Sequence, residues 1–350
     1  MQHRFLGLGI GAAALLAFPA TSMAKTIDVF PGDSIQHAVQ HAHSGDVIRV
    51  HEGVYRGSVE ITKNGLTLRG AGADKKDGSV IKPKRTKRCQ GGTDGICVLP
   101  HKKGGRKART TDTVIEGFLI RGFKGSGVLA IGTKHTTVQH NKFDADGEYG
   151  AAAFGSMRTK FLHNLATDND EAGFYIGDSP RARAILRGNR ARANGSFGFF
   201  LRDASHARVL RNEAVHNCLG IGLINTGAPG DVRNWHVLNN EADSNNRFCK
   251  AEEGAPPISG TGIALLGAKK SVIRNNSVLS NKPAQPVPFA GGIVVASGKP
   301  LGGSDSAHNV IARNQALKNK PADLVWDGKG KDNKFRQNRC DTSQPSGLCH

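Results

Sequence analysis

Carboxylates gather just before two short apolar segments of this 350-residue chain. Asp146 and Glu148 precede the first segment, and Asp170 and Glu171 precede the second. If the two segments stack as neighbouring strands, equivalent acids such as Asp146 and Asp170 would lie about 5 Å apart. That separation suits a carboxylate pair for retaining glycoside hydrolysis, or several oxygens around Ca²⁺. The four acids are therefore candidate metal ligands with Ca²⁺ as the candidate cofactor, and solvated turn acids are the alternative.

A second group of reactive side chains follows the same segments. It contains Tyr175, Arg202, Asp203 and His206. Removal of a proton from a uronate needs a cation to neutralise the carboxylate and a base to take the proton. These residues form the predicted catalytic set, in which Arg202 neutralises and Tyr175 or His206 acts as base. In the structural alternative, Arg202 is a surface residue paired with Asp178 or Asp203.

The candidate substrate-binding residues are Phe200, Asp178, Asn225 and His135. Phe200 and Tyr175 could form a platform on which sugar rings lie. Alternatively, long insertions fold back and cover the apolar surface that carries the two rings. The sequence leaves both interpretations open.

The chain is strongly basic, with 48 Lys and Arg against 29 Asp and Glu and a net charge of +19. Half of this excess lies in a predicted insertion over residues 82–112, where the ten basic residues from Lys82 to Arg109 face only Asp94. Such a balance favours an acidic polysaccharide or another polyanion as partner. Nucleic acid is disfavoured because no aromatic residues interleave with the basic ones. Alternatively, the insertion keeps an exported protein soluble or touches anionic envelope polymers.

A repeat determines how these residues are positioned. An apolar stretch ending in asparagine recurs eight times, at intervals of 23, 25, 23, 28, 36, 38 and 24 residues. The asparagines are Asn141, Asn164, Asn189, Asn212, Asn240, Asn276, Asn314 and Asn338. A unit of about 24 residues cannot bury its apolar side alone, so copies must stack with strands in parallel and with the asparagines in a ladder. This predicts one all-β domain over residues 25–350, a single-stranded right-handed parallel β-helix (solenoid) of about ten coils, rather than a β-sandwich or a leucine-rich-repeat horseshoe.

Between the asparagines lies a second strand that begins with glycine. The residue after each glycine should point inward, and alternate residues outward. The expected inward column is Val128, Phe174, Phe199, Ile221, Ile263 and Ile293. The first expected outward column is Leu129, Ala152, Tyr175, Phe200, Gly222, Ala264 and Val294. The second is Ile131, Phe154, Gly177, Arg202, Ile224, Leu266 and Ala296.

Both ends of the stack carry recognisable caps. Ile35, Ala38, Val39 and Ala42 form a one-sided apolar stripe that predicts a short N-terminal capping helix. Six cysteines form three sequence-local couples, which we expect as disulfides: Cys89 with Cys97, Cys218 with Cys249, and Cys340 with Cys349. The first couple is expected to pin a small hairpin within the basic insertion, and the third to fasten the last coil.

Residues 1–24 are typical of an export signal, because His3 and Arg4 precede an apolar run that ends in Ser22-Met23-Ala24. No later segment has the roughly 20 apolar residues that a membrane span needs. We therefore expect a secreted or periplasmic protein, monomeric and without a membrane span.

The stretch DSIQHAVQHAHSGDVIRVHEGVYRGSVEITKNGLTLRGAG, followed by the glycine and asparagine repeats, resembles the pectin-lyase-like superfamily of exported right-handed β-helix proteins. That superfamily includes lyases, hydrolases, epimerases and non-catalytic binding proteins, so the resemblance implies a fold more than an activity. The NTD, DD and RIK set of polygalacturonases and the YGxDPHD motif of mannuronan epimerases are missing from the sequence. The resulting prediction is recognition of an acidic polysaccharide, with β-elimination if the protein is catalytic. The alternative is a non-catalytic envelope or surface-polymer binding protein.

Overall fold

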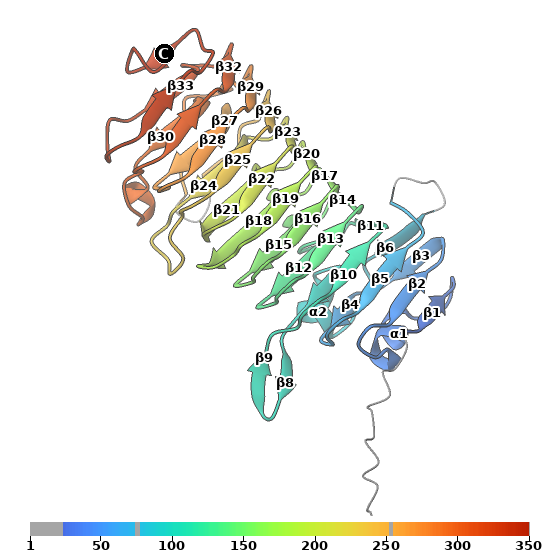
Figure 1. Ribbon diagram of the computed structural model, residues 1–350. Helices are drawn as coiled ribbons and strands as arrows, with labels where there is room; N and C mark the ends of the chain where they lie inside the picture. The colour runs from blue at the N-terminus through green and yellow to red at the C-terminus, as the bar shows by residue number, and fades with distance from the viewer. Residues whose placement is uncertain (1–23, 74–77, 252–254, 350) are drawn as a thin grey trace, which may run out of the picture.

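The chain winds into a right-handed parallel β-helix, as predicted (Figure 1). The computed structural model describes residues 24–73, 78–251 and 255–349, so the predicted export signal lies outside the described residues except for Ala24. Three parallel sheets, here called A, B and C, run the length of the stack. Along the chain a coil visits A, then B, then C, so the structure adds a third strand to the two that the sequence repeat identifies. No helix in the described ranges has the length and apolar character needed to cross a bilayer.

Strand bounds follow the three sheets. Sheet A contains β1 (Thr26–Val29), β2 (Val47–Val50), β5 (Thr67–Gly70), β10 (Val114–Glu116), β13 (Thr137–Gln139), β16 (Lys160–Leu162), β19 (Ile185–Arg187), β22 (Arg208–Leu210), β25 (His236–Leu238), β28 (Val272–Arg274), β31 (Val310–Ala312) and β34 (Lys334–Arg336). Sheet B contains β3 (Gly53–Arg56), β6 (Ser79–Lys82), β11 (Phe118–Arg121), β14 (Lys142–Asp144), β17 (Leu165–Thr167), β20 (Arg190–Arg192), β23 (Glu213–Val215), β26 (Glu241–Asp243), β29 (Ser277–Leu279) and β32 (Gln315–Leu317). Sheet C contains β4 (Val59–Ile61), β7 (Ile96–Val98), β12 (Val128–Ile131), β15 (Tyr149–Phe154), β18 (Ala172–Ser179), β21 (Phe197–Ala204), β24 (Leu219–Ile224), β27 (Thr261–Leu266), β30 (Gly291–Ala296), β33 (Leu324–Trp326) and β35 (Ser343–Gln344).

The glycine-led strands form sheet C, and their predicted columns are confirmed. Direct register pairs Tyr175 with Ala152 on one side and with Phe200 on the other. The same register continues through Gly222, Ala264 and Val294. The predicted inward residues, from Val128 to Ile293, are all fully buried in the core. Parallel stacking thus carries each residue onto its equivalent in the next coil.

The predicted asparagine ladder occupies the corner between sheets A and B. In a typical step, the backbone N–H and Nδ2 of Asn164 both donate to Oδ1 of Asn189, each at 3.0 Å. The Nδ2 group also donates to the carbonyl of Val138, one coil back, at 2.9 Å. The ladder satisfies backbone groups that the sharp turn would otherwise leave unpaired inside the protein.

A second asparagine ladder, which the sequence analysis missed, lies at the corner between sheets B and C. Its members are buried and bond to one another in the same way: Asn169, Asn194, Asn217, Asn245, Asn281 and Asn319. Acids stand at its two ends. Asp146 occupies the first position, and Asp323 accepts hydrogen bonds from the N–H and Nδ2 of Asn319 at 3.0 and 2.9 Å.

The N-terminal cap is confirmed as helix α1 (Ile35–His41), which follows strand β1 and packs against β1, β2 and β4. Its N-cap is Ser34, whose hydroxyl accepts the His37 N–H at 3.2 Å. Ile35, Ala38 and Val39 are buried, so the helix turns its apolar stripe toward the stack. The cap thus covers core residues that the first coil would expose.

All three predicted disulfides are present. The hairpin prediction is wrong in detail, because the segment between Cys89 and Cys97 holds the short helix α2 (Arg88–Gly92), and Cys97 belongs to β7. The hairpin instead joins β8 (His101–Lys103) to β9 (Arg106–Ala108) through Gly104 and Gly105, and it projects from the body (Figure 1). A 3₁₀ turn, η1 (Lys299–Leu301), completes the helical elements of the described residues.

Candidate functional site

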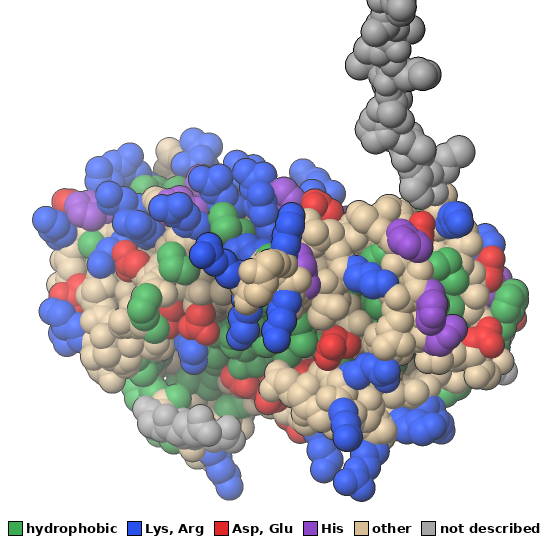
Figure 2. All heavy atoms as spheres, turned by 90° about the horizontal axis from the view of Figure 1, so that it is seen from below, with side chains coloured by type: hydrophobic (Ala, Val, Ile, Leu, Met, Phe, Trp, Pro, Cys, Tyr) green, Lys and Arg blue, Asp and Glu red, His purple; other side chains and the backbone are tan. Residues whose placement is uncertain are grey.

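The outer face of sheet C is covered over only part of its length. Toward the C-terminal end, Ile258, Phe289 and Leu301 pack onto it from loops, which confirms the predicted cover there. Toward the N-terminal end, a separate cluster of aromatic and aliphatic side chains keeps several partly exposed members. Figure 2 shows hydrophobic side chains recessed between acidic and basic ones on one face of the molecule. The two alternatives raised by the sequence therefore apply to different halves of one face.

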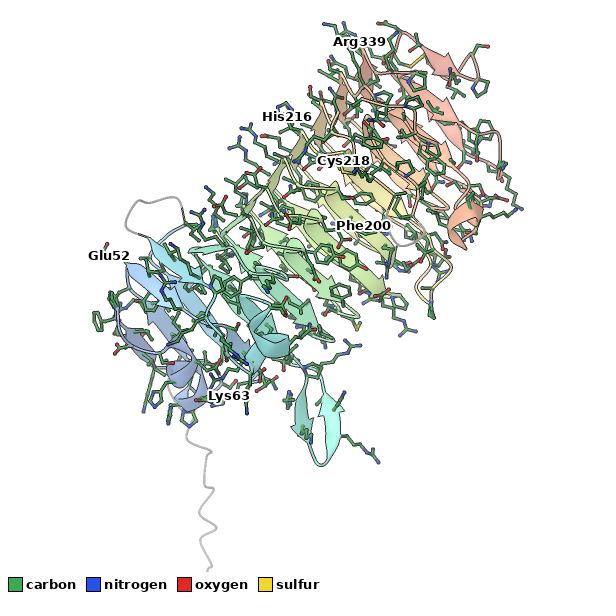
Figure 3. All side chains as sticks on the ribbon, turned by 180° about the vertical axis from the view of Figure 1, so that it is seen from behind. Glu52, Lys63, Phe200, His216, Cys218 and Arg339 are labelled. Atoms are coloured by element: carbon green, nitrogen blue, oxygen red, sulfur yellow. A yellow bond between two sulfur atoms is a disulfide. The ribbon has the colours of Figure 1, made fainter. Side chains whose placement is uncertain are left out.

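Five rings form the exposed half, and we call them the aromatic cluster: Tyr149, Phe154, Tyr175, Phe197 and Phe200. The ring centroids of Phe154 and Tyr175 are 4.5 Å apart, and Phe200 meets Tyr175 edge-on at 5.2 Å. Phe197 stacks on Phe200 at 4.2 Å. Tyr175 is only 1% exposed, whereas Phe154, Phe197 and Phe200 are partly exposed. In Figure 3, Phe200 lies midway along the stack. The exposed ring surfaces can pack against the apolar faces of a sugar.

A glycine makes room for the Tyr175 hydroxyl. A Cβ atom at Gly177 would lie 1.9 Å from the Tyr175 Oη atom, so no larger residue fits there without moving the ring. Arg202 lies on the neighbouring strand, β21, directly beside Gly177. Its Cζ atom is 6.0 Å from the centroid of the Tyr175 ring. The small residue thus lets a phenol and a guanidinium meet over the sheet.

Two donors in this place lack hydrogen-bond partners. Tyr175 Oη and Arg202 Nε are both buried, and neither makes a hydrogen bond to a residue within the described ranges. Buried polar atoms in folded proteins are almost always hydrogen-bonded. The hydrogen-bonding capacity of both atoms is therefore unused in this conformation, and an acceptor from outside the chain reaches them only after a neighbouring side chain moves.

Two carboxylates hold Arg202, as the structural alternative predicts. Asp178 Oδ1 lies 3.5 Å from its Nη2 atom, and Asp203 Oδ2 lies 3.6 Å from its Nε atom. Burial disfavours the charged guanidinium, but Tyr175, Asp178 and Asp203 outweigh that effect, so the pKa of Arg202 is raised. The Asp203 side chain is fully buried and accepts the Thr226 backbone N–H at 2.9 Å. Asp203 thus orients Arg202 and a loop rather than facing solvent.

The environment of Tyr175 works against its predicted role as a base. Burial raises the pKa of this phenol above its ordinary value, and the nearby Arg202 offsets only part of the rise. A base must lose its proton before it can accept one from substrate. A neutral, hydrogen-donating Tyr175 is the form that this site stabilises.

Three other predicted residues lie away from the aromatic cluster or are committed elsewhere. His206 and His135 occupy the exposed corner between sheets C and A, three coils apart in one column. His206 Nε2 contacts Asn234 Nδ2 at 2.9 Å, and His135 Nδ1 contacts Asp112 at 3.0 Å. Asn225 is buried, and its amide holds two loops together through Asp231 and Ser304. Its polar atoms serve the fold, because every one of them has a partner.

The expected stacking of Asp146 on Asp170 is wrong. Asp144 pairs with Thr167, so Asp146 aligns with Asn169 and bonds to it through its backbone N–H at 3.1 Å. The Asp146 side chain points into the protein, where its Oδ1 accepts the Phe123 N–H at 3.0 Å and its Oδ2 has no partner within the described residues. Burial raises the pKa of this carboxyl to about 8. Asp170, by contrast, is exposed.

The acids that do stack are Glu148 and Glu171, because the Glu171 backbone N–H donates to the Glu148 carbonyl at 2.9 Å. Burial, followed by the charge of Asp94, raises the pKa of Glu148. Glu171 interacts with the hydroxyl of Tyr149 in the aromatic cluster. Within the described ranges, no three or more His, Cys, Asp or Glu side chains are grouped so that they could hold a metal ion. The four predicted Ca²⁺ ligands are thus not brought together in this geometry.

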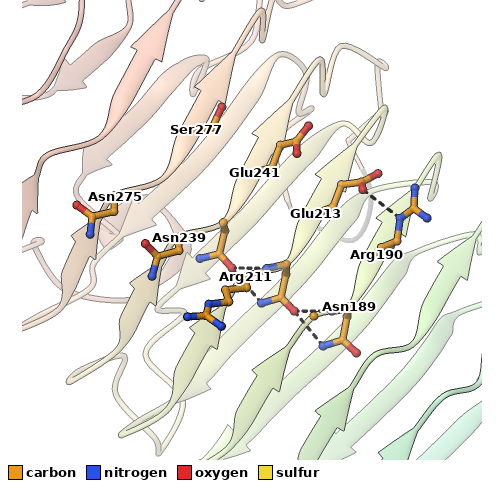
Figure 4. Close-up of a pocket in the computed structure, with 11 residues that line it drawn as sticks. Asn189, Arg190, Arg211, Glu213, Asn239, Glu241, Asn275 and Ser277 are labelled. Atoms are coloured by element: carbon orange, nitrogen blue, oxygen red, sulfur yellow. Dashed lines mark hydrogen bonds and ion pairs between the residues drawn. The ribbon is translucent and has the colours of Figure 1, made fainter.

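A separate depression of about 530 Å³ lies at the corner between sheets A and B (Figure 4). Its lining includes the ladder residues Asn189 and Asn212, whose amides bond to the next coil. Arg190 pairs with Glu213 at 3.0 Å. The floor asparagines already have partners, whereas the exposed side chains of Arg211, Asn239 and Glu241 also line the depression.

Sequence reasoning missed two members of the aromatic cluster, Tyr149 and Phe197. Both immediately precede the glycine of a sheet C strand, Gly150 and Gly198. Register aligns both with Ala172, which shows that the outward pattern extends one residue before each glycine. The constant offset from glycine was the available signal.

Comparison with known proteins agrees with the fold. The chain matches the family described as "Right handed beta helix region" over residues 85–242 and 126–349. No curated protein sequence matches it.

Several solved structures share the architecture. The A-module of mannuronan C-5 epimerase AlgE6 from Azotobacter vinelandii superposes with a TM-score of 0.62 at 14% identity, covering 87% of this chain and 88% of that one. The family 28 exopolygalacturonase of Yersinia enterocolitica has a TM-score of 0.55 at 9% identity, covering 92% and 78%. The alginate lyase of Paenibacillus sp. str. FPU-7 has a TM-score of 0.51 at 15% identity, covering 88% and 99%. Identities this low establish a shared fold alone.

Proposed function

This chain belongs to the right-handed β-helix family, and on that premise we propose that it is an exported, monomeric protein that binds an acidic polysaccharide on the outer face of sheet C. The observation that carries the proposal is the adjacent pair Tyr175 and Arg202, whose Oη and Nε atoms make no hydrogen bond within the described residues, beside the partly exposed rings of the aromatic cluster. Rings bind the apolar faces of sugars, and the two donors suit a carboxylate or another anionic substituent.

The electrostatic setting supports an acidic rather than a neutral sugar. Arg202 stays cationic here, because its neighbours raise its pKa. Its contact with the half-exposed Asp178 is 3.5 Å long, outside the range of a strong charge-assisted hydrogen bond. A substrate carboxylate can therefore approach the guanidinium in competition with Asp178.

The names of structurally similar proteins agree with this class of ligand. They include a mannuronan epimerase, an alginate lyase and an exopolygalacturonase. The fold supplies a surface on which such polymers are handled, and the residues beside Tyr175 supply the contacts in this chain. The substrate class therefore rests on those contacts and not on the fold.

Cleavage by β-elimination is the second candidate, because Arg202 and Tyr175 are adjacent over the sheet. The raised pKa of Tyr175 and the corner position of His206 favour binding over this reaction. Incubation with polygalacturonate and alginate, followed by ultraviolet absorbance of unsaturated uronate products, separates the two. We expect no absorbance change. A steady rise that Tyr175→Phe abolishes would establish the lyase instead.

The binding experiment uses calorimetry of the full exported chain with polygalacturonate, alginate and neutral dextran. Phe200→Ala and Arg202→Gln should each weaken binding to the acidic polymers by about tenfold, since each removes a central contact. The matched controls are Phe30→Ala, which removes a 53%-exposed phenylalanine, and Arg56→Gln, which removes an exposed arginine of sheet B. Equal losses in variants and controls, or equal binding of dextran, would refute the proposal.

A further inference from the structure

The outer face of sheet A from β16 to β34 is basic without compensating acids. Its outward positions carry six exposed cationic residues, and no Asp or Glu occurs in these strands. The six are Lys160, Arg187, Arg208, Arg274, Lys334 and Arg336. We call this surface the basic face. Figure 2 shows Lys and Arg side chains crowded along the upper margin of the molecule in that view.

The flanking corners extend the same charge. Exposed Arg183 and Lys270 lie in the turn from sheet C to sheet A, and exposed Arg211 and Arg313 lie in the turn from sheet A to sheet B. Their positions repeat from coil to coil, because each follows the parallel register of the stack. The cations therefore share columns along the stack, with neutral or histidine residues in the coils between them.

These charges are unpaired, although the same sheet pairs its charges elsewhere. In the first coils, Asp28 binds Arg49, and Arg69 binds Glu116. From β16 onward, none of the six cations of the basic face has an ion pair with a residue in the described ranges. Cations on one face without paired acids create a positive potential there, and this potential favours an anionic occupant.

The positive potential of the basic face affects the pKa of a histidine in the same sheet. His236 lies in β25 between the coils of Arg208 and Arg274. Burial lowers the pKa of His236, and the two arginines lower it further. A positive field thus extends over the middle of the face.

The side chains between the cations indicate what kind of anion fits. Leu162, Ile185, Leu210, Leu238 and Val272 are half-buried at outward positions and leave a flat surface. No outward Phe, Tyr or Trp is present in these strands for stacking of bases. From β16 to β34 the strands are six spacings apart in the stack, so the face is about 29 Å long.

We propose that the basic face binds a linear acidic polysaccharide laid along the stack, at a site separate from the aromatic cluster of sheet C. Arginines contact the carboxylates or sulfates of the polymer, and the aliphatic strips contact its sugar rings. This site does not depend on Tyr175 or Arg202. It can therefore be confirmed or refuted independently of the function proposed for sheet C.

The test compares two triple variants that remove the same charge. One is Arg187→Gln, Arg208→Gln and Arg274→Gln on the basic face. The other is Lys102→Gln, Arg106→Gln and Lys107→Gln on the projecting β8–β9 hairpin. Binding to polygalacturonate and to heparin is measured by calorimetry at low and high salt, with thermal melting to confirm folding.

We expect the basic-face triple to bind about tenfold more weakly at low salt, because three exposed charge contacts of ordinary strength are lost. Its binding should also depend less on salt. The hairpin triple should stay within about twofold of the parent. Equal losses in the two triples would show an effect of net charge alone, and an unchanged basic-face triple would remove the site; either result overturns the proposal.

Two further measurements distinguish the basic face from the sheet C site and a polysaccharide partner from a membrane. Arg202→Gln combined with the basic-face triple should lose more binding than either alone if both sites exist. If only Arg202→Gln weakens binding, the sheet C function survives and the basic face does not. Vesicles of anionic phospholipid form the last arm: binding to vesicles that the basic-face triple abolishes, with polysaccharide binding unaffected, would assign the face to a membrane and refute the proposal.

Discussion

Replacement of Asp146 by asparagine should stabilise the protein at neutral pH. Asp146 holds the first position of the second asparagine ladder, where its Oδ1 accepts the Phe123 N–H. At later positions, the amide Nδ2 donates to the next ladder oxygen, as Asn169 does to Asn194 at 2.8 Å. Asp146 Oδ2 takes the place of that donor and has no partner among the described residues. Asparagine would supply the missing donor.

The size of the expected stabilisation follows from the raised pKa of Asp146. The pKa of Asp146 lies at about 8 in the fold against 3.8 for an ordinary aspartate, so the folded chain keeps a proton that the unfolded chain releases. The stability that this neutral acid contributes is full below about pH 4 and is lost as the pH rises to about 8, at about 1.4 kcal/mol per pH unit. Between about pH 4 and pH 7, this slope gives a loss of unfolding free energy of at most about 4 kcal/mol. An unsatisfied buried polar group costs about 1–3 kcal/mol in measured cases, and we expect a gain in that range for Asp146→Asn.

The assay is urea unfolding of the parent and of Asp146→Asn at pH 5, 6, 7 and 8. The difference in unfolding free energy should grow with pH, because asparagine does not titrate. Asp168→Asn, in an exposed turn of the next coil, serves as the control and should show no such trend. Parallel pH profiles for Asp146→Asn and the parent, or a variant less stable than the parent at pH 7, would refute the reasoning.

Three further outcomes are expected. Asn212→Ala should lower the free energy of unfolding by about 2–4 kcal/mol by urea titration, because it leaves ladder groups above and below unpaired, whereas exposed Asn239→Ala should change it by less than about 0.5 kcal/mol. Tyr175→Phe should leave the melting temperature nearly unchanged, since its hydroxyl has no partner in the described fold, but should weaken calorimetric binding of polygalacturonate several-fold; a large loss of stability would show that the hydroxyl is bonded after all. Replacement of Cys340 and Cys349 by serine should cost about 2–3 kcal/mol and increase hydrogen exchange first in the last coil, and uniform exchange along the stack would contradict this.

The columns of sheet C were predictable because parallel stacking repeats each side chain at a fixed offset. Tyr175, Phe200 and Arg202 consequently lie where the glycine pattern places them. The stacking of Asp146 on Asp170 failed because the local interval is 23 residues, as it is between Asn141 and Asn164, and a step of 23 from Asp146 reaches Asn169. An average period cannot assign residues that lie one position apart.

The second ladder was also within reach of the sequence. Its asparagines follow those of the first by a constant five residues, as Asn169 follows Asn164 and Asn194 follows Asn189. The positions of Asn225 and His206 were not predictable in the same way. Loops between coils have no period, so their contacts depend on three-dimensional packing that no repeat describes.

The five-residue step between the two ladders has a consequence for how such a chain can change in length. It spans one short strand of sheet B and two sharp turns, and it stays the same in coils whose total length varies from 23 to 38 residues. In the coils that carry both ladders, insertions therefore lie at the two margins of sheet C, while the strands of sheets A and B form a spine of constant spacing. Loops around sheet C can be exchanged, lengthened or grafted from coil to coil without disturbing the spine, which makes this side of the molecule the natural place to engineer a new specificity.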